Sequence, residues 1–86
     1  EKFILLTDVP GILDEEGGLM STLNRDDING LKASGVIKGG MLPKVDACLG
    51  ALSSGVNKAH IVDGRVPHAV LLELFTDEGI GTEILA

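Results

Sequence analysis

The sequence is poor in aromatic residues and in positive charge. It has no tryptophan or tyrosine and only two phenylalanines, and its 13 acidic residues outnumber its 7 lysines and arginines. Proteins that bind nucleic acid by base stacking or through a basic face need the opposite composition. We therefore expect no nucleic-acid partner and favour a small molecule as the ligand.

Cysteine and long apolar runs are also scarce. Cys48 is the single cysteine, so an internal disulfide is excluded, and with only two histidines no zinc spacing exists. We predict no metal-ligand cluster and expect a reducing, cytoplasmic compartment. No run approaches the roughly 20 apolar residues of a membrane span, and no segment resembles a signal peptide, so we expect no membrane partner.

Length and composition predict one small globular unit. The chain has 86 residues, a net charge of -6 and 44% hydrophobic residues, which suits a single core over residues 1–86 without a further domain boundary. A chain of this size buries only about 60% of its unfolded surface. Because an apolar run also begins after two residues, we expect a piece of a longer protein.

The order of apolar patterns predicts an α/β fold. Apolar runs at 3–9, 58–64 and 81–86 are typical of buried strands, and the acidic, glycine-containing stretch 11–20 predicts a surface excursion. Helical spacing predicts a short helix at 24–35, a longer one at 41–52 and a third at 67–75. We expect a three-layer α/β/α arrangement with a mainly parallel sheet.

Two aspartates follow predicted strands. Asp8 and Asp63 would lie beyond the carboxyl ends of the strands, where ligands bind in open α/β sheets. An aspartate at such a position also commonly caps a turn or the next helix. Both interpretations stay open.

Lys44 lies in the first turn of the second predicted helix, directly after Gly39 and Gly40. The helix dipole disfavours a cation there by a few tenths to about 1 kcal/mol. Backbone amides, glycines that allow close approach and an ammonium would together bind an anion such as phosphate. The alternative is a solvated lysine paired with Asp46, and the standard phosphate-loop motifs do not match.

The remaining candidates are two histidines and the cysteine. His60, inside an apolar run, is predicted to be packed, and Cys48 is predicted to lie in the core. His68 opens the third helix with Glu73 on the same helix and a glycine-rich exit behind it. This arrangement predicts either a small polar ligand site or an exposed helix start.

Several stretches resemble acetylglutamate kinases, members of the amino-acid kinase superfamily. They are LLTDVPGIL, GGMLPKVDACL and HIVDGRVPHAVLLELFTDEGIGT, which occur in this order and span nearly the whole chain. The first two also resemble the wider superfamily, including carbamate kinase, aspartokinase and gamma-glutamyl kinase. The last stretch, with DGRVPH and LFTDEGIGT, resembles the acetylglutamate branch.

The resemblance implies a role for particular residues. Lys44 would be the catalytic lysine that stabilises the transition state of phosphoryl transfer. The residues implied in ATP binding are Asp8, Val9, Pro10, Gly11, Ile12, Leu13, Val36, Ile37, Lys38 and Met41. Those implied in binding arginine as an inhibitor are His68, Glu73, Gly79, Gly81 and Thr82.

The resemblance further implies that the chain is the carboxy-terminal, ATP-binding part of an enzyme of arginine biosynthesis. That enzyme would phosphorylate the side-chain carboxylate of N-acetyl-L-glutamate with ATP and Mg²⁺ and would form a homo-oligomer. We expect no activity from the 86-residue chain alone. Two alternatives stay open, namely a superfamily kinase with another acceptor and a non-catalytic module that binds arginine.

Overall fold

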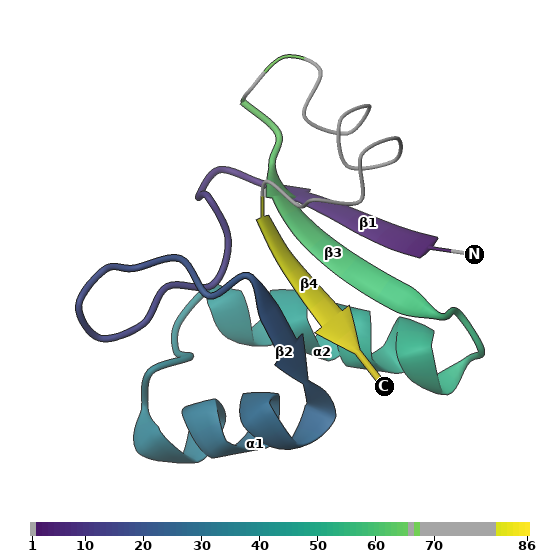
Figure 1. The fold of residues 1–86 in the computed structure, drawn as a ribbon, viewed down its shortest axis with the longest axis horizontal. Coiled ribbons are helices and arrows are strands. Elements are labelled where there is room, and N and C mark those ends of the chain that lie inside the picture. The colour runs from purple at the N-terminus through teal and green to yellow at the C-terminus, as the bar shows by residue number, and fades with distance from the viewer. Residues whose placement is uncertain (1, 66, 68–80) are drawn as a thin grey trace.

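The structure, a computed structural model, describes residues 2–65, 67 and 81–86 and shows the predicted mixture of helices and strands (Figure 1). The elements follow in the order β1 (Lys2–Thr7), β2 (Thr22–Asn24), α1 (Arg25–Ser34), α2 (Met41–Ser53), β3 (Lys58–Asp63) and β4 (Gly81–Leu85). The α/β class is confirmed. The third predicted helix, at 67–75, lies almost entirely outside the described residues.

The strands form one sheet in the order β1-β3-β4-β2. The pairs β1–β3 and β2–β4 are parallel, as predicted for most of the sheet, whereas β3 and β4 pair antiparallel. The sheet is therefore mainly parallel, as expected, with one antiparallel pair between the segments 58–64 and 81–86. The last strand returns alongside β3 in the opposite direction, with Val62 opposite Gly81.

Helix α1 begins and ends at the residues that the sequence predicts. Asn24 is the N-cap: its side chain accepts from the Asp27 amide, and the Asp27 carboxylate accepts from the Asn24 amide. This reciprocal capping box satisfies two backbone donors at the helix start. Gly35 ends the helix in the left-handed region with φ 84°, which glycine adopts without a Cβ penalty.

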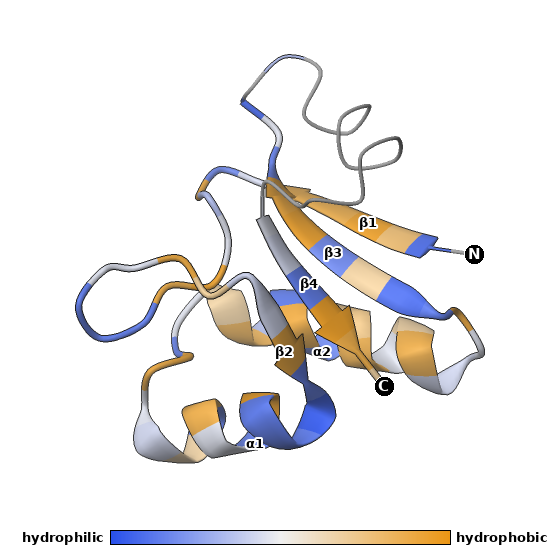
Figure 2. Cartoon of the chain, viewed as in Figure 1, coloured by the Kyte–Doolittle hydropathy of each residue, from blue (hydrophilic) through white to orange (hydrophobic). Residues whose placement is uncertain are grey.

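Helix α2 supplies much of the core. Its apolar positions recur every three or four residues, so they share one face, and Val45, Cys48, Leu49 and Leu52 are buried. Figure 2 shows apolar residues along β1 and β3 above this helix. The core cluster consists of Ile12, Leu23, Ile28, Ile37, Val45, Cys48, Leu49, Leu52, Ala59, Ile61 and Ile84.

Two predictions about single core residues are confirmed. Cys48 is fully buried, and burial raises the pKa of its thiol to about 11, as expected for a packed rather than reactive cysteine. His60, on β3, is 1% exposed and lies 3.7 Å from the Glu83 carboxylate of the neighbouring strand.

The excursion predicted at 11–20 is held on the sheet by a buried threonine of the last strand. Leu13 and Leu19 bridge in antiparallel fashion. The Thr82 hydroxyl accepts from the Ile12 amide and donates to the Met20 carbonyl, both at 2.8 Å. The excursion therefore starts and ends at fixed points beside β4. In the described part, no helix is long and apolar enough to cross a membrane.

Candidate active site

The site lies where β1 and β3 end side by side. Thr7 and Asp63, the last residues of the two parallel strands, are paired in register, and the Gly64 amide donates to the Thr7 carbonyl at 2.8 Å. Asp8 follows directly. The structure therefore brings both aspartates that the sequence singled out to the same carboxyl edge of the sheet.

Lys44 reaches this edge from the first turn of α2. Its Nζ lies 2.5 Å from Thr7 Oγ1 and 3.7 Å from Asp8 Oδ1. Asp46 instead pairs with Lys32 of α1, at 2.5 Å. The alternative of a solvated lysine beside Asp46 is therefore wrong, because the Lys44 ammonium crosses to β1.

The backbone amides at the start of α2 contribute less than we expected. The Met41 and Leu42 amides donate to the carbonyls of Lys38 and Gly39, and Pro43 has no N–H. An anion at this helix end would thus meet the Lys44 ammonium more than free amide donors. The glycines do leave room, since a Cβ at Gly39 or Gly40 would meet nothing within 4 Å.

An apolar cleft of about 180 Å³ lies on the same side of the molecule. Residues from the loop after β1 form one wall and residues before and at the start of α2 form the other. The lining residues are Val9, Gly11, Ile12, Leu13, Val36, Ile37 and Met41. The volume is below the roughly 300–1,000 Å³ of complete ligand pockets, so the cleft suits one apolar or planar part of a ligand.

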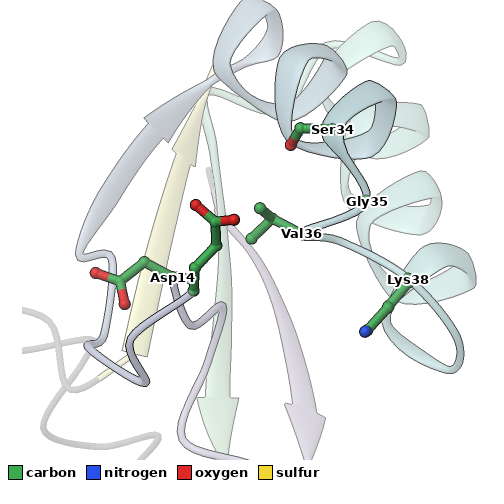
Figure 3. A pocket seen from close by; sticks show the side chains of 6 residues that line it. Asp14, Ser34, Gly35, Val36 and Lys38 are labelled. Atoms are coloured by element: carbon green, nitrogen blue, oxygen red, sulfur yellow. The ribbon is translucent and has the colours of Figure 1, made fainter.

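A polar pocket of about 380 Å³ adjoins the cleft and shares Val36 with it. Figure 3 shows Asp14, on the excursion, across the pocket from the segment between α1 and α2 that carries Lys38, with its carboxylate turned away from that segment. The Asp14 carboxylate is fixed by the amides of Glu16 and Gly18, at 2.9 and 2.8 Å. The two cavities together offer an apolar and a polar compartment.

Most residues that the resemblance implied in ATP binding come together here. Seven of them line the apolar cleft, Lys38 lines the polar pocket, and Asp8 lies beside Lys44, whereas Pro10 is exposed and lines neither cavity. Thr7 and Asp14 were missed. Thr7 could have been identified from the sequence, because its hydroxyl stands at the last position of an apolar strand and directly before Asp8.

Asp63 caps a turn, which is one of the two roles that the sequence left open for an aspartate after a strand. The Arg65 side chain donates to both carboxylate oxygens at 2.9 and 2.8 Å, and the Arg65 amide donates to Oδ1 at 2.9 Å. These hydrogen bonds, the side-chain ones first, lower the pKa of Asp63 to about 2. Asp63 therefore shapes the edge of the site, while Asp8 faces the lysine.

We expect Asp63 in the folded chain to titrate near pH 2 and to move towards pH 4 in an Arg65→Gln variant. Because folding depresses this pKa, the pair stabilises the fold above about pH 4 and the gain is lost as pH falls towards 2. A carboxyl NMR titration measures the midpoint. Arg25→Gln is the control, since Arg25 bonds Leu49 and Ser53. A midpoint near pH 2 in Arg65→Gln would contradict the assignment.

The residues implied in arginine binding are only partly described. Gly81 and Thr82 are buried in β4, and the Thr82 hydroxyl bonds Ile12 and Met20 within the chain. His68, Glu73 and Gly79 lie outside the described residues. The role of this set in effector binding stays a prediction.

Comparison with known proteins places the chain in a family. The model of the amino acid kinase family matches residues 1–63. The chain is 62% identical to an acetylglutamate kinase of Nitratiruptor sp. over 85 residues and to one of Persephonella marina over 86 residues. These alignments cover 99% and 100% of the chain but only 30% and 29% of the relatives. The chain thus spans about 30% of the length of the curated relatives it matches.

A solved structure shows the same fold. An N-acetylglutamate synthase from Neisseria gonorrhoeae, complexed with coenzyme A and L-arginine, superimposes with a TM-score of 0.87 at 32% sequence identity. The match covers 99% of this chain and 20% of the synthase. The strand order, the position of Lys44 and the family match over residues 1–63 lead to one conclusion: the chain belongs to the amino acid kinase family.

Proposed function

We propose that the chain forms the nucleotide-binding part of an acetylglutamate kinase. The enzyme would transfer the γ-phosphoryl group of ATP to the side-chain carboxylate of N-acetyl-L-glutamate, a step of arginine biosynthesis. The identity of 62% to acetylglutamate kinases over nearly the whole chain supports this acceptor. The chain spans about 30% of those relatives, and in this proposal the acceptor would bind mainly to the rest of the enzyme.

One observation carries the proposal, namely a lysine ammonium at the carboxyl edge of the sheet on the same side as an apolar cleft. Lys44 lies at the ends of β1 and β3, and Met41, one turn earlier on α2, lines the cleft. An apolar cleft suits an adenine ring, and a cation suits the phosphates. Their common origin on the first turn of α2 fixes the two subsites relative to each other.

Lys44 would act on the charge that the transferring group carries. Phosphoryl transfer needs positioning and electrostatic stabilisation of equatorial oxygens more than covalent help from side chains. Lys44 is one-third exposed, so its ammonium is open to a ligand. The Lys38 ammonium would lie beside the sugar and polar portion of the nucleotide in the adjoining pocket, whose opposite wall includes Asp14.

Mg²⁺ fits the exposed edge of the site. The described residues contain no cluster of three metal-ligating side chains. Magnesium in kinases is held through one or two carboxylates, substrate phosphates and water, and Asp8 offers an exposed carboxylate. When bound, Mg²⁺ would neutralise charge on the ATP phosphates.

We also propose that the complete enzyme is inhibited by arginine through the segment from His68 to Thr82. The Neisseria synthase, which shares the fold of this chain, was solved in complex with L-arginine. Thr82, the last residue of this segment, accepts a hydrogen bond from the Ile12 amide, and Ile12 belongs to the loop that lines the cleft. A cytoplasmic location and a homo-oligomeric state complete the proposal.

The test uses a complete acetylglutamate kinase that contains these 86 residues, referred to below as the complete kinase. Phosphorylation of N-acetyl-L-glutamate by MgATP is measured against glutamate, aspartate and carbamate as competing acceptors. We expect turnover with N-acetyl-L-glutamate and a fall in rate with millimolar arginine. Preference for another acceptor would indicate a different superfamily kinase.

Calorimetry distinguishes the kinase from the non-catalytic alternative. If the chain belonged to a non-catalytic effector module, it would show arginine binding without nucleotide binding. Unchanged activity of the complete kinase in arginine would contradict the regulatory proposal but not the catalytic one. The 86-residue chain alone serves as a negative control, from which we expect no turnover.

A further inference from the structure

Thr7 holds the ammonium of Lys44, although 37 positions separate the two residues. Thr7 is the last residue of β1 and only 8% exposed. The Lys44 Nζ donates to its hydroxyl oxygen at 2.5 Å. Buried polar groups need hydrogen-bond partners, and the Lys44 ammonium supplies one for the nearly buried Thr7 hydroxyl. Because the donor is charged, this hydrogen bond is stronger than one between neutral groups.

The neighbouring carboxylate binds the ammonium much more loosely. Asp8 Oδ1 lies 3.7 Å from the Lys44 Nζ, and the Asp8 side chain is 80% exposed. An exposed ion pair at that distance is screened by water and salt and is weak. The group that fixes the lysine is therefore neutral. The ammonium is placed without being neutralised, so its charge stays available to an anionic ligand.

The hydroxyl itself is rigidly placed. Thr7 pairs in register with Asp63, and the Gly64 amide donates to its carbonyl at 2.8 Å, so its backbone is held against the end of β3. The β-branched threonine side chain has few χ1 rotamers. Lysine, in contrast, has many rotamers and must lose that freedom to act at one point in space.

On this geometry we propose that Thr7 is a positioning residue for Lys44 in phosphoryl transfer, an inference that rests on the proposed kinase function. Its hydroxyl holds the ammonium at the carboxyl edge of the sheet before the transferring group arrives. Thr7 would contribute to catalysis through preorganisation, because an ammonium that is already in place need not reorient when negative charge develops on the transferring group.

The test compares Thr7→Val with Thr7→Ser in the complete kinase. Valine keeps the branched shape and removes the acceptor, so we expect kcat to fall about 10- to 100-fold with KM for MgATP changed less than about threefold. Serine keeps the hydroxyl and should restore kcat to within about threefold of the original. Thr7→Ala replaces Thr7→Val should valine disturb folding, which thermal unfolding reports.

A double variant separates positioning from a general structural role. If Thr7 acts through the lysine, adding Thr7→Val to Lys44→Ala should lower kcat no further. Thr22→Val, at an exposed position of the edge strand β2, is the matched control and should leave activity unchanged.

Three outcomes would overturn the inference. They are full kcat in Thr7→Val, equal losses in Thr7→Val and Thr7→Ser, and the same effect of Thr7→Val with and without Lys44. In each of these cases, a large loss of kcat in Lys44→Ala would still support the proposed kinase function. Full activity in Lys44→Ala, or no turnover by the complete kinase, would instead contradict the proposed function itself.

Discussion

Replacement of Lys44 by alanine is expected to lower kcat of the complete kinase by about 10²- to 10³-fold, with a much smaller change in KM for MgATP. The ammonium lies at the end of β1, 2.5 Å from Thr7 Oγ1, and about one-third of the Lys44 side chain is exposed. Its loss removes positive charge where negative charge develops on the transferring phosphoryl group. Steady-state kinetics with MgATP and N-acetyl-L-glutamate measures both constants.

The matched control for this variant is Lys32→Ala. Lys32 also belongs to a helix and also forms an ion pair, with Asp46, but it lines neither cavity. Its exposed pair contributes about 0–1 kcal/mol, so both activity and folding should change little. A Lys44→Ala enzyme with activity within twofold of the original would contradict the catalytic assignment. Unfolding curves for both variants confirm that the comparison concerns chemistry.

Replacement of Gly81 by alanine should destabilise the fold by about 3–5 kcal/mol. A Cβ at this position would lie 1.9 Å from the Ile61 carbonyl oxygen and 3.0 Å from Val62 Cα. Both neighbours are backbone atoms of β3, so they cannot rotate away as a side chain would. Relief requires β4 to move off β3, which breaks antiparallel hydrogen bonds at the centre of the sheet. Denaturant unfolding of the complete kinase measures the loss.

Gly50→Ala makes the same chemical change as Gly81→Ala, but we expect it to raise the stability of the protein. Gly50 is exposed within α2, and a Cβ there would meet nothing within 4 Å. Alanine in a helix interior is more favourable than glycine by about 0.5–1 kcal/mol, so this variant should be slightly more stable. Equal stability of the Gly81→Ala and Gly50→Ala proteins would show that β3 and β4 do not approach as closely as the structure has them.

The Gly81 result also bears on how the closing segment is interpreted. The resemblance implied Gly81 and Thr82 in effector binding, and the structure gives both residues a structural reason to be present. Gly81 allows close approach of two strands, and Thr82 ties the excursion to β4. These constraints are compatible with an effector role, which the arginine assay on the complete kinase tests separately.

Local patterns were sufficient to predict helices α1 and α2 and strands β1, β3 and β4. The capping residues Asn24 and Gly35 set the limits of α1, and apolar spacing set the buried face of α2. Strand β2 was missed, because its three residues contain one buried leucine between two exposed positions. A segment that short has no periodicity, and it becomes a strand only by pairing with β4, about 60 positions later.

The site divides in the same way between sequence and tertiary structure. The sequence by itself determined that a cation stands in the first turn of α2 and that aspartates follow two strands, since helix and strand limits are set by neighbouring residues. Only the tertiary structure decided that Lys44 contacts Thr7 rather than Asp46 and that β4 runs antiparallel to β3. These choices depend on contacts between segments far apart in the chain, and side-chain and backbone hydrogen bonds across such distances leave no periodic trace in the sequence.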